Sequence, residues 1–391
     1  MPKRVLISTL PPQLGGGVVT MTNFIVDCLE RKGYDITLAY YYPYSLKPML
    51  SVPIQKLFRQ CPKSEKTYQR KLTCYGIGAY LPELEFTHYH PHGIWKKLIG
   101  DHDYHVVVSG HALAALPFYK TQKKCLAWLA SPFDADRSKR LQLFPWYRKI
   151  LDRLLVAPVC RHYERKILAN NPIMALSYYT QKQLQKIVNK PYPLLSMPIN
   201  TKLFKHNASA TIPWRILFVG RFNDPRKNIP LLLNAITTIV QKQHPITLDI
   251  VGSDDPTALV SMLKKHQLHQ HVCIHAHASQ DTLLTLLQSA DLFVIPSQQE
   301  GLCIAALEAM ACGCPVISTK CGGPEEFVIP EKTGTLVDFD SNEMAQAIIS
   351  ICSDRTLRQK LSQGALHLIQ RHYSYEAQSK QFYACFEHYK T

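Results

Sequence analysis

Short apolar segments alternate with amphipathic stretches along most of the chain, which predicts strands separated by helices. Between the first two apolar segments, Gly15-Gly16-Gly17 leads into a helical pattern over Val18–Arg31. A strand, a glycine-rich loop, a helix and a second strand are typical of a parallel sheet covered by helices. The strands predicted for the first half are Arg4–Leu10, Tyr34–Tyr42, Tyr104–Ser109, Lys124–Ala130 and Ile173–Ser177.

The alternation is more regular in the second half, which begins near Trp214 after a predicted link around 200–213. Such regularity favours a doubly wound α/β domain. Its predicted strands are Ile216–Val219, Thr247–Val251, Val272–His275, Asp291–Ile295 and Pro315–Ser318. Its predicted helices are Arg226–Gln243, Thr257–Gln267, Gln280–Ser289 and Cys303–Cys312, followed by a helical tail from Asn342.

Two stretches of the first half are harder to assign. Prolines interrupt every pattern over residues 43–100. The basic, aromatic-rich stretch Trp146–Leu168 predicts a helix that is broken or kinked at Pro158.

The charge of the chain differs sharply between its halves. The 391 residues carry a net charge of +16, and residues 1–200 hold 28 basic and 12 acidic residues, against 17 of each in 201–391. The length favours two or three domains, and the basic half is expected to meet an anionic membrane, an acidic acceptor or nucleic acid. No signal peptide or membrane-spanning run is expected, and twelve cysteines without a signal suggest reduced thiols in the cytoplasm.

Ligands of open α/β sheets bind at the carboxyl ends of the strands, so the loops that follow strands are the places to search. The first such loop contains Arg221 and Lys227 around Asp224-Pro225, which resembles a helix N-cap followed by proline. A lysine is electrostatically unfavourable at a helix N-terminus, so a bound phosphate between the two cations would explain it. A solvated basic turn is the alternative.

A second loop ends in Glu300, and Gly301-Leu302 are expected to open the next helix with free backbone N–H groups. Glu308 is the single charge on that otherwise apolar helix, so it needs a partner. One carboxylate can accept hydrogen bonds from both hydroxyls of a vicinal diol. A structural salt bridge is the alternative. In a third loop, Gly322-Gly323 allows close backbone approach to a ligand or forms an ordinary tight turn.

Together these loops resemble retaining glycosyltransferases of family 4, which have the GT-B fold. The resemblance covers residues 214–340 well and the first half loosely. The matching features are a G-R-x5-K loop, an E-x7-E pair and a G-x-P-V-I…G-G-x-x-E segment, namely Gly220, Arg221, Lys227, Glu300, Glu308, Gly313, Pro315, Gly322, Gly323 and Glu326. It implies an α/β architecture of two facing Rossmann-like domains with the donor site in the cleft. The implied parts are an acceptor domain over 1–205, a donor domain over 206–373 and a C-terminal helix over 374–391 that packs back on the acceptor domain.

The resemblance also implies an activity and roles for residues. The enzyme would transfer a hexose from a UDP- or GDP-linked sugar to an acceptor hydroxyl with retention, using no metal and no other cofactor. Arg221 and Lys227 would neutralise the diphosphate, Glu308 would hold the ribose and Glu300 would contact the sugar. The donor-binding set is completed by Gly16, Gly17, Gly220, Gly301, Leu302 and Cys303. The family's usual histidine is replaced by Ser131, and His111 is the candidate for the acceptor side.

The acceptor is expected to be a polysaccharide or a glycolipid, and the basic half suggests a peripheral position on the inner face of a membrane. A solvated basic surface with a core helix is the alternative. The candidate contacts are Arg59, Lys63, Lys66, Arg70, Lys71, Lys96, Lys97, Lys120, Lys123 and Lys124, with Phe144, Trp146, Tyr147, Arg148, Lys149, Leu151 and Arg153. A nucleic-acid-binding protein and a non-catalytic sugar-nucleotide-binding protein remain alternatives, although the motifs of nucleic-acid modules are absent, so no nucleic-acid partner is predicted.

Overall fold

A computed structural model describes residues 2–14, 16–135, 137, 141, 144–204 and 214–390. It divides into two compact units, residues 1–196 with 379–391 (unit 1) and residues 197–378 (unit 2). The divisions therefore fall at 196/197 and 378/379, rather than at the predicted 205/206 and 373/374. Gly15 and residues 205–213 of the predicted link lie outside the described residues.

Unit 1 is built on a seven-stranded sheet in the order β3-β4-β2-β1-β5-β6-β7, in which only β3 is antiparallel to its neighbour. The strands are β1 (Arg4–Thr9), β2 (Asp35–Tyr41), β3 (Ser64–Gln69), β4 (Leu72–Ile77), β5 (Tyr104–Ser109), β6 (Leu126–Leu129) and β7 (Ile173–Ala175). The helices are α1 (Gly17–Arg31), α2 (Ile94–Gly100), α3 (Leu116–Lys120), α5 (Trp146–Leu151), α6 (Ala157–Asn170) and α7 (Tyr178–Ile187).

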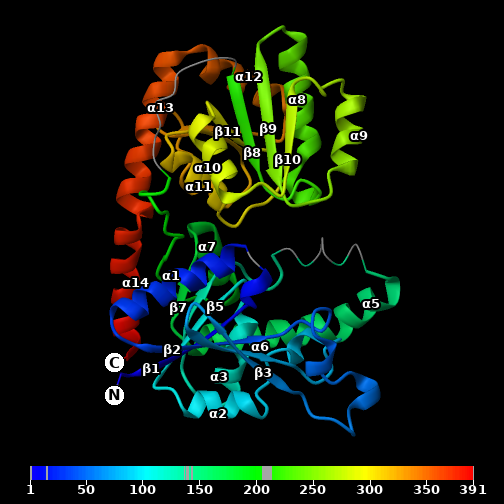
Figure 1. Ribbon diagram of the computed structural model, residues 1–391, viewed down its shortest axis with the longest axis vertical. Helices are drawn as coiled ribbons and strands as arrows, with labels where there is room; N and C mark the ends of the chain where they lie inside the picture. Colours follow the sequence, from blue (N-terminus) through cyan, green and yellow to red (C-terminus); the bar gives the residue numbers. More distant parts are fainter. Residues whose placement is uncertain are drawn as a thin grey trace. The chain divides into compact units, whose positions relative to one another are not determined.

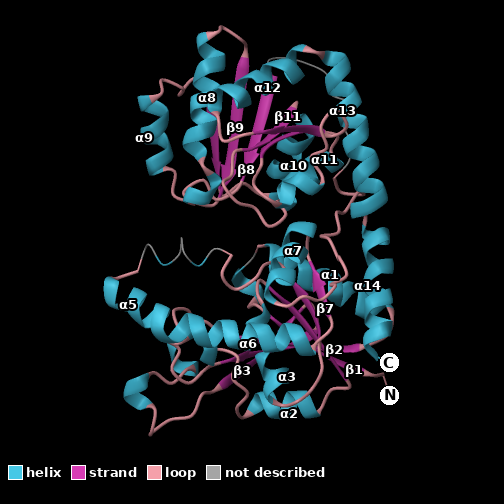
Figure 2. Ribbon diagram, turned by 180° about the vertical axis from the view of Figure 1, so that it is seen from behind, coloured by secondary structure: helices cyan, strands magenta, loops and turns pink. Residues whose placement is uncertain are grey.

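Helices cover both faces of this sheet, as Figures 1 and 2 show. Apolar side chains of α2, α3 and α6 pack with Leu6 and Val107 on one face. On the other face, Phe24 of α1 makes edge contacts with Trp128 of β6 and with Phe382 of α14 (Tyr375–Lys390). Residues 379–390 of α14 therefore complete the core of unit 1, although the chain that precedes them belongs to unit 2.

Unit 2 contains a six-stranded parallel sheet in the order β10-β9-β8-β11-β12-β13. Its strands are β8 (Trp214–Val219), β9 (Ile246–Gly252), β10 (Val272–Ala276), β11 (Leu292–Ile295), β12 (Val316–Thr319) and β13 (Gly334–Val337). Its helices are α8 (Ile229–Gln241), α9 (Thr257–Lys265), α10 (Gln280–Ser289), α11 (Ile304–Ala311), α12 (Ser341–Ser353) and α13 (Arg355–Leu368). Apolar residues of α8, α9 and α12 form the core on one face, and α10 and α11 lie against the other.

Several predicted elements differ from the observed ones. The predicted helix Arg226–Gln243 is a 3-10 turn over Pro225–Lys227 followed by α8, because Asn228 adopts a left-handed conformation between them. Asp224 caps the 3-10 turn rather than the α-helix. Cys303 is left-handed too, so α11 begins at Ile304 and Gly301-Leu302 lie before the helix instead of opening it.

The stretch Trp146–Leu168 is helical throughout, so the predicted break at Pro158 is wrong. A π-helix, η6 (Asp152–Val156), lies between α5 and α6, and Pro158 occupies the first turn of α6. A proline has no N–H to donate, and the change of register at the π turn accommodates this loss. Residues 43–100 contain β3, β4 and α2, which the sequence pattern did not indicate.

Candidate active site

The strand order of unit 2 defines where a ligand would bind. β8 pairs with β9 on one side and with β11 on the other. The connection that follows β8 therefore leads toward one edge of the sheet, and the connection that follows β11 leads toward the opposite edge. A crevice forms outside the carboxyl ends of the strands at such a switch point. The loop that follows β8 holds Gly220, Arg221 and Lys227, and the loop that follows β11 holds Glu300. The topology therefore brings two of the three candidate loops together.

The first loop holds its cations in different environments. The Arg221 side chain is 63% exposed, and its Nη2 atom lies 3.0 Å from Asp224 Oδ2. Arg226 donates to both oxygens of Asp224, which lowers the pKa of that carboxyl despite its partial burial. Lys227 is only 17% exposed. A solvated turn therefore describes Arg221 but not Lys227, whose stem packs beside Gly220.

Lys227 and Glu300 form an ion pair across the switch point. Lys227 Nζ donates to Glu300 Oε1 over 2.6 Å, and the Glu300 side chain is 11% exposed. Ser297 Oγ donates to the same oxygen over 2.6 Å. Burial alone would lower the pKa of Lys227, but the Glu300 carboxylate outweighs it and the pKa is raised. An ion pair with so little exposed surface is costly to desolvate, so its presence here favours a polar function over a packing role.

The second and third loops are joined by backbone hydrogen bonds. Glu300 N donates to Cys321 O over 2.8 Å, and Gly323 N donates to Glu300 O over 3.0 Å. A Cβ atom added to Gly323 would lie 2.3 Å from the carbonyl oxygen of Gly301, so only glycine permits this approach. Leu302 is buried and Cys303 forms the left-handed turn before α11, so any donor contact by Gly301-Leu302-Cys303 would come from the backbone.

Glu308 lies on α11 and is part-buried there. Its carboxylate makes no hydrogen bond or ion pair with any residue that the structure describes. Burial raises the pKa of the Glu308 carboxyl from 4.5 to about 7. The structural salt bridge that was the alternative for this segment is thus found for Glu300 and not for Glu308. An unpartnered, desolvated carboxylate can gain most from hydroxyl donors of a ligand.

The candidates of unit 1 gather at the switch point of its own sheet, between β1 and β5. Gly16 precedes α1 with φ of 85°, and Gly17 is the first residue of that helix. His111 follows β5, and its Nδ1 accepts from Leu113 N over 3.3 Å. That bond leaves the proton of a neutral ring on Nε2, which lies 3.8 Å from Glu85 Oε1. Ser131, after β6, donates its hydroxyl proton to Gly110 O.

The sequence did not point to Ser297 or Glu85. Ser297 is completely buried beside Glu300, and a lone serine in a loop carries no pattern that would mark it. Glu85 lies in the proline-broken region and forms an ion pair with Arg137, which also pairs with Asp152. The contact between Glu85 and His111 joins residues that no local motif relates.

Comparison with known proteins adds to this geometry. Residues 200–367 match the family model described as glycosyl transferases group 1. A phosphatidyl-myo-inositol mannosyltransferase of Mycobacterium leprae is 24% identical over 233 residues, which cover 59% of this chain and 57% of that protein. A D-inositol 3-phosphate glycosyltransferase of Salinispora arenicola is 30% identical over 161 residues, covering 38% and 36%. The chain thus spans about half or less of the length of these relatives.

Solved structures match the whole chain. A sucrose-phosphate synthase of Thermosynechococcus elongatus superposes with a TM-score of 0.74 at 21% identity, covering 99% of each chain. The Anabaena protein HepE in complex with UDP gives a TM-score of 0.72 at 14% identity, covering 99% of this chain and 100% of that one. At such identity the likeness concerns the fold. The chain therefore has the GT-B fold, and its residues 200–367 match the glycosyl transferases of group 1.

Proposed function

We propose that this protein is a retaining, metal-independent glycosyltransferase that moves a hexose from a UDP- or GDP-linked sugar to an acceptor hydroxyl. The observation that carries the proposal is the pairing of Lys227 with Glu300 at the switch point of unit 2; on α11, Glu308 adds a carboxylate with no partner among the described residues. The match of residues 200–367 to group 1 glycosyl transferases supports it.

The residues divide the work as follows. Lys227 and Arg221 neutralise the diphosphate as the bond between the sugar and its phosphate breaks. Glu308 accepts hydrogen bonds from both ribose hydroxyls, and Glu300 contacts the hydroxyls of the sugar. The acceptor oxygen forms the new bond on the face that the diphosphate leaves, and the proton of the acceptor hydroxyl passes to the departing phosphate oxygen. No protein nucleophile takes part. Gly16, Gly17 and His111 serve the same reaction from unit 1, with His111 on the acceptor side.

Lys227 is the residue that tests the donor site. We expect Lys227→Met to abolish transfer, because the diphosphate loses a buried cation; such groups contribute several kcal/mol to catalysis. The variant also leaves Glu300 buried without its partner, so it should be less stable. The double variant Lys227→Met/Glu300→Gln should recover much of that stability without recovering transfer. The measurement is turnover of UDP-glucose and GDP-mannose together with thermal unfolding, with Lys242→Met at an exposed position of unit 2 as the control.

Three results would contradict parts of the proposal. Transfer by Lys227→Met within about threefold of wild type would remove the role in leaving-group stabilisation, because the expected loss is far larger. Inversion of the anomeric configuration in the product would exclude retention. Loss of activity on treatment with a chelator, restored by a divalent cation, would exclude metal independence. Nucleotide-sugar binding without turnover would favour the non-catalytic alternative, and salt-sensitive DNA retention without transfer the nucleic-acid one.

The acceptor that we propose is borne on a membrane, because unit 1 exposes an apolar and basic helix surface. In α5 and η6, Trp146 and Leu154 are each 73% exposed, whereas Asp152 and Val156 are buried. At 100° per residue, the exposed apolar residues cover about half of the helix circumference, and the cations lie beside them. This α5 surface comprises Trp146, Tyr147, Arg148, Lys149, Ile150, Leu151, Arg153, Leu154 and Leu155. The core helix that was the alternative is therefore wrong for α5.

A second exposed segment adds to this surface. Phe58 is 98% exposed, and Met49 and Ile54 are also exposed, close in sequence to Lys56 and Arg59. The segment projects on the same side of unit 1 as α5 in Figures 1 and 2. Apolar residues among cations suit the headgroup region of an anionic bilayer. The name of the Mycobacterium leprae relative, which refers to phosphatidyl-myo-inositol, is consistent with a lipid acceptor.

Vesicle cosedimentation tests this acceptor surface. We expect binding to vesicles that contain phosphatidylglycerol, weaker binding at high salt, and little binding to phosphatidylcholine alone. Trp146→Ser/Ile150→Ser/Leu154→Ser should lose binding, whereas Val260→Ser/Phe339→Ser, at exposed apolar positions of unit 2, should keep it. A protein that stays in the supernatant at low salt, or a triple variant that binds as wild type does, would contradict a membrane-borne acceptor.

A further inference from the structure

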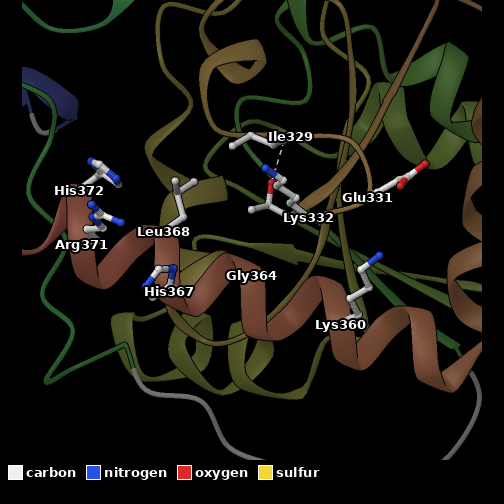
Figure 3. A pocket seen from close by; sticks show the side chains of 10 residues that line it. Ile329, Glu331, Lys332, Lys360, Gly364, His367, Leu368, Arg371 and His372 are labelled. Carbon is white, nitrogen blue, oxygen red and sulfur yellow. Dashed lines mark hydrogen bonds between the residues drawn. The ribbon is translucent and has the colours of Figure 1, made fainter.

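Unit 2 contains a pocket at the opposite end of its sheet from the candidate active site. The pocket, of about 300 Å³, lies between helix α13 with the π-helix η9 (Ile369–Tyr373) and the segment that leads into β13 (Figure 3). That segment meets the amino end of β13, whereas Arg221, Lys227 and Glu300 follow the carboxyl ends of β8 and β11. The cavity, here called the α13 pocket, is therefore separate from the donor residues. Its volume is at the lower end of the range for small-molecule sites.

Basic side chains dominate the wall of the α13 pocket. It is lined by Lys332, Lys360, His367, Arg371 and His372, with Glu331 as the one acidic residue among those lining it. Within the described chain, the side chains of Lys332, Lys360 and Arg371 form no ion pair. By contrast, Arg215, Lys227 and Arg358 of the same unit each face a carboxylate. Positive charge that is gathered around one cavity and left uncompensated favours an anionic ligand.

The helix presents these groups on one face. Lys360, Gly364, His367 and Arg371 are spaced by three or four residues, which places them along one side of the helical run, as Figure 3 shows. Gly364 packs directly on the opposing segment, because a Cβ atom there would lie 1.9 Å from Lys332 O. This contact fixes the distance between the two walls, so the cations on each side face a preformed cavity.

We propose that the α13 pocket binds a small phosphorylated organic molecule of the size of a hexose phosphate. Lys360 from the helix and Lys332 from the opposing segment bind the phosphate, since lysine acts as a point charge. Arg371 lies eleven residues further along the helical run, about 16 Å from Lys360, and its planar fork of donors binds the hydroxyls at the other end of the ligand. Ile329 and Leu368 supply an apolar surface for the carbon skeleton. This ligand is additional to the nucleotide sugar, and the inference stands on observations separate from those at the active site.

Thermal unfolding in the presence of glucose 6-phosphate tests the site. A ligand that binds the folded state raises the midpoint by mass action, so we expect a clear rise at about 10 mM glucose 6-phosphate. Glucose should give no rise, and inorganic phosphate a smaller one. The rise should vanish in Lys360→Gln/Arg371→Gln, both at exposed positions, and persist in Lys264→Gln/Lys265→Gln on the surface of α9.

The active-site variant separates this site from the donor site. Lys227→Met/Glu300→Gln should keep the response to glucose 6-phosphate while losing the response to UDP, and Lys360→Gln/Arg371→Gln should show the reverse. The proposal is overturned if wild type shows no rise, if the pocket variant responds as wild type does, or if the active-site variant loses the response. If inorganic phosphate raised the unfolding midpoint as much as glucose 6-phosphate does, the proposal that the ligand is an organic phosphate would be overturned.

Discussion

The Glu308 carboxyl is partly buried on α11, where burial reduces its solvation by water. Its folded-state pKa of about 7 lies above the ordinary value of 4.5, so the folded protein binds this proton more tightly than the unfolded chain does. The associated stabilisation is complete below about pH 4.5 and is lost as the pH rises through about 7. At pH 8 the ionised group therefore destabilises unit 2 until a ligand supplies hydrogen-bond donors.

We predict that Glu308→Gln stabilises the ligand-free protein at pH 8. A shift from 4.5 to about 7 corresponds to roughly 3 kcal/mol in the free energy of unfolding, and the difference from wild type should disappear near pH 4. Urea unfolding of unit 2 at both pH values measures it. The same variant should bind UDP more weakly at pH 8, because an amide cannot accept from two ribose hydroxyls as a carboxylate does. A variant no more stable than wild type at pH 8 would show that burial of the ionised carboxylate does not destabilise the folded protein.

The chemical role of a candidate residue was predictable from the sequence where a single segment contained the whole signal. The isolated charge of Glu308 is visible in its own helix, and the Asp224-Pro225 signal correctly located a capped turn. The partner of Lys227 was not predictable, because Glu300 lies 73 residues further along the chain. Their meeting depends on β11, rather than β9 alone, lying beside β8.

At the scale of elements, loops at the strand ends differ in how firmly they are held. The loops after β11 and β12 are bound to each other through Glu300, Cys321 and Gly323.

The elements that the sequence did not predict were missed for identifiable reasons. Strand β3 is exposed and polar over most of its length, and the turn between β3 and β4 uses Arg70 and Lys71 with positive φ instead of glycine or asparagine. Neither the apolar alternation nor the usual hairpin signal is present there.

We predict that Gly323→Ala separates these two loops. Its Cβ atom would meet backbone atoms of Gly301 and Leu302, which cannot move aside as a flexible side chain can. The cost should be about 1–3 kcal/mol in the stability of unit 2, together with weaker UDP binding, because displacement of Glu300 also releases Lys227, the cation assigned to the diphosphate. Calorimetric titration with UDP and thermal unfolding measure both effects. Gly100→Ala is the control, since a Cβ atom there meets nothing within 4 Å; equal behaviour of the two variants would contradict the prediction.

At the scale of the molecule, most of the last helix, from Ser379 onward, belongs to the unit that contains the first strand. Phe382 and Phe386 of α14 are almost completely buried, Phe386 makes ring contacts with Tyr34 and Tyr104, and the Tyr383 hydroxyl donates to Cys28 O. No helix in the described parts of the chain is long and apolar enough to span a membrane.

We predict that Phe386→Ala destabilises unit 1 by about 3–5 kcal/mol, as expected for loss of a buried aromatic ring. Hydrogen exchange should accelerate in β1, β5 and α1, while the strands of unit 2 keep their protection. The control is Tyr375→Phe, which retains the ring at the part of α14 assigned to unit 2. Equal loss of protection in both units would show that α14 does not belong selectively to unit 1.

The position of residues 379–390 also sets an order of events during synthesis. When the ribosome has made residues 1–196, unit 1 still lacks the helix that supplies Phe382 and Phe386 to its core. Unit 2 is complete first, although it is encoded later. At roughly 5–20 residues per second, the apolar surface that receives α14 stays uncovered for on the order of ten seconds or more. Chaperone dependence during translation should therefore be concentrated on the first half of this protein.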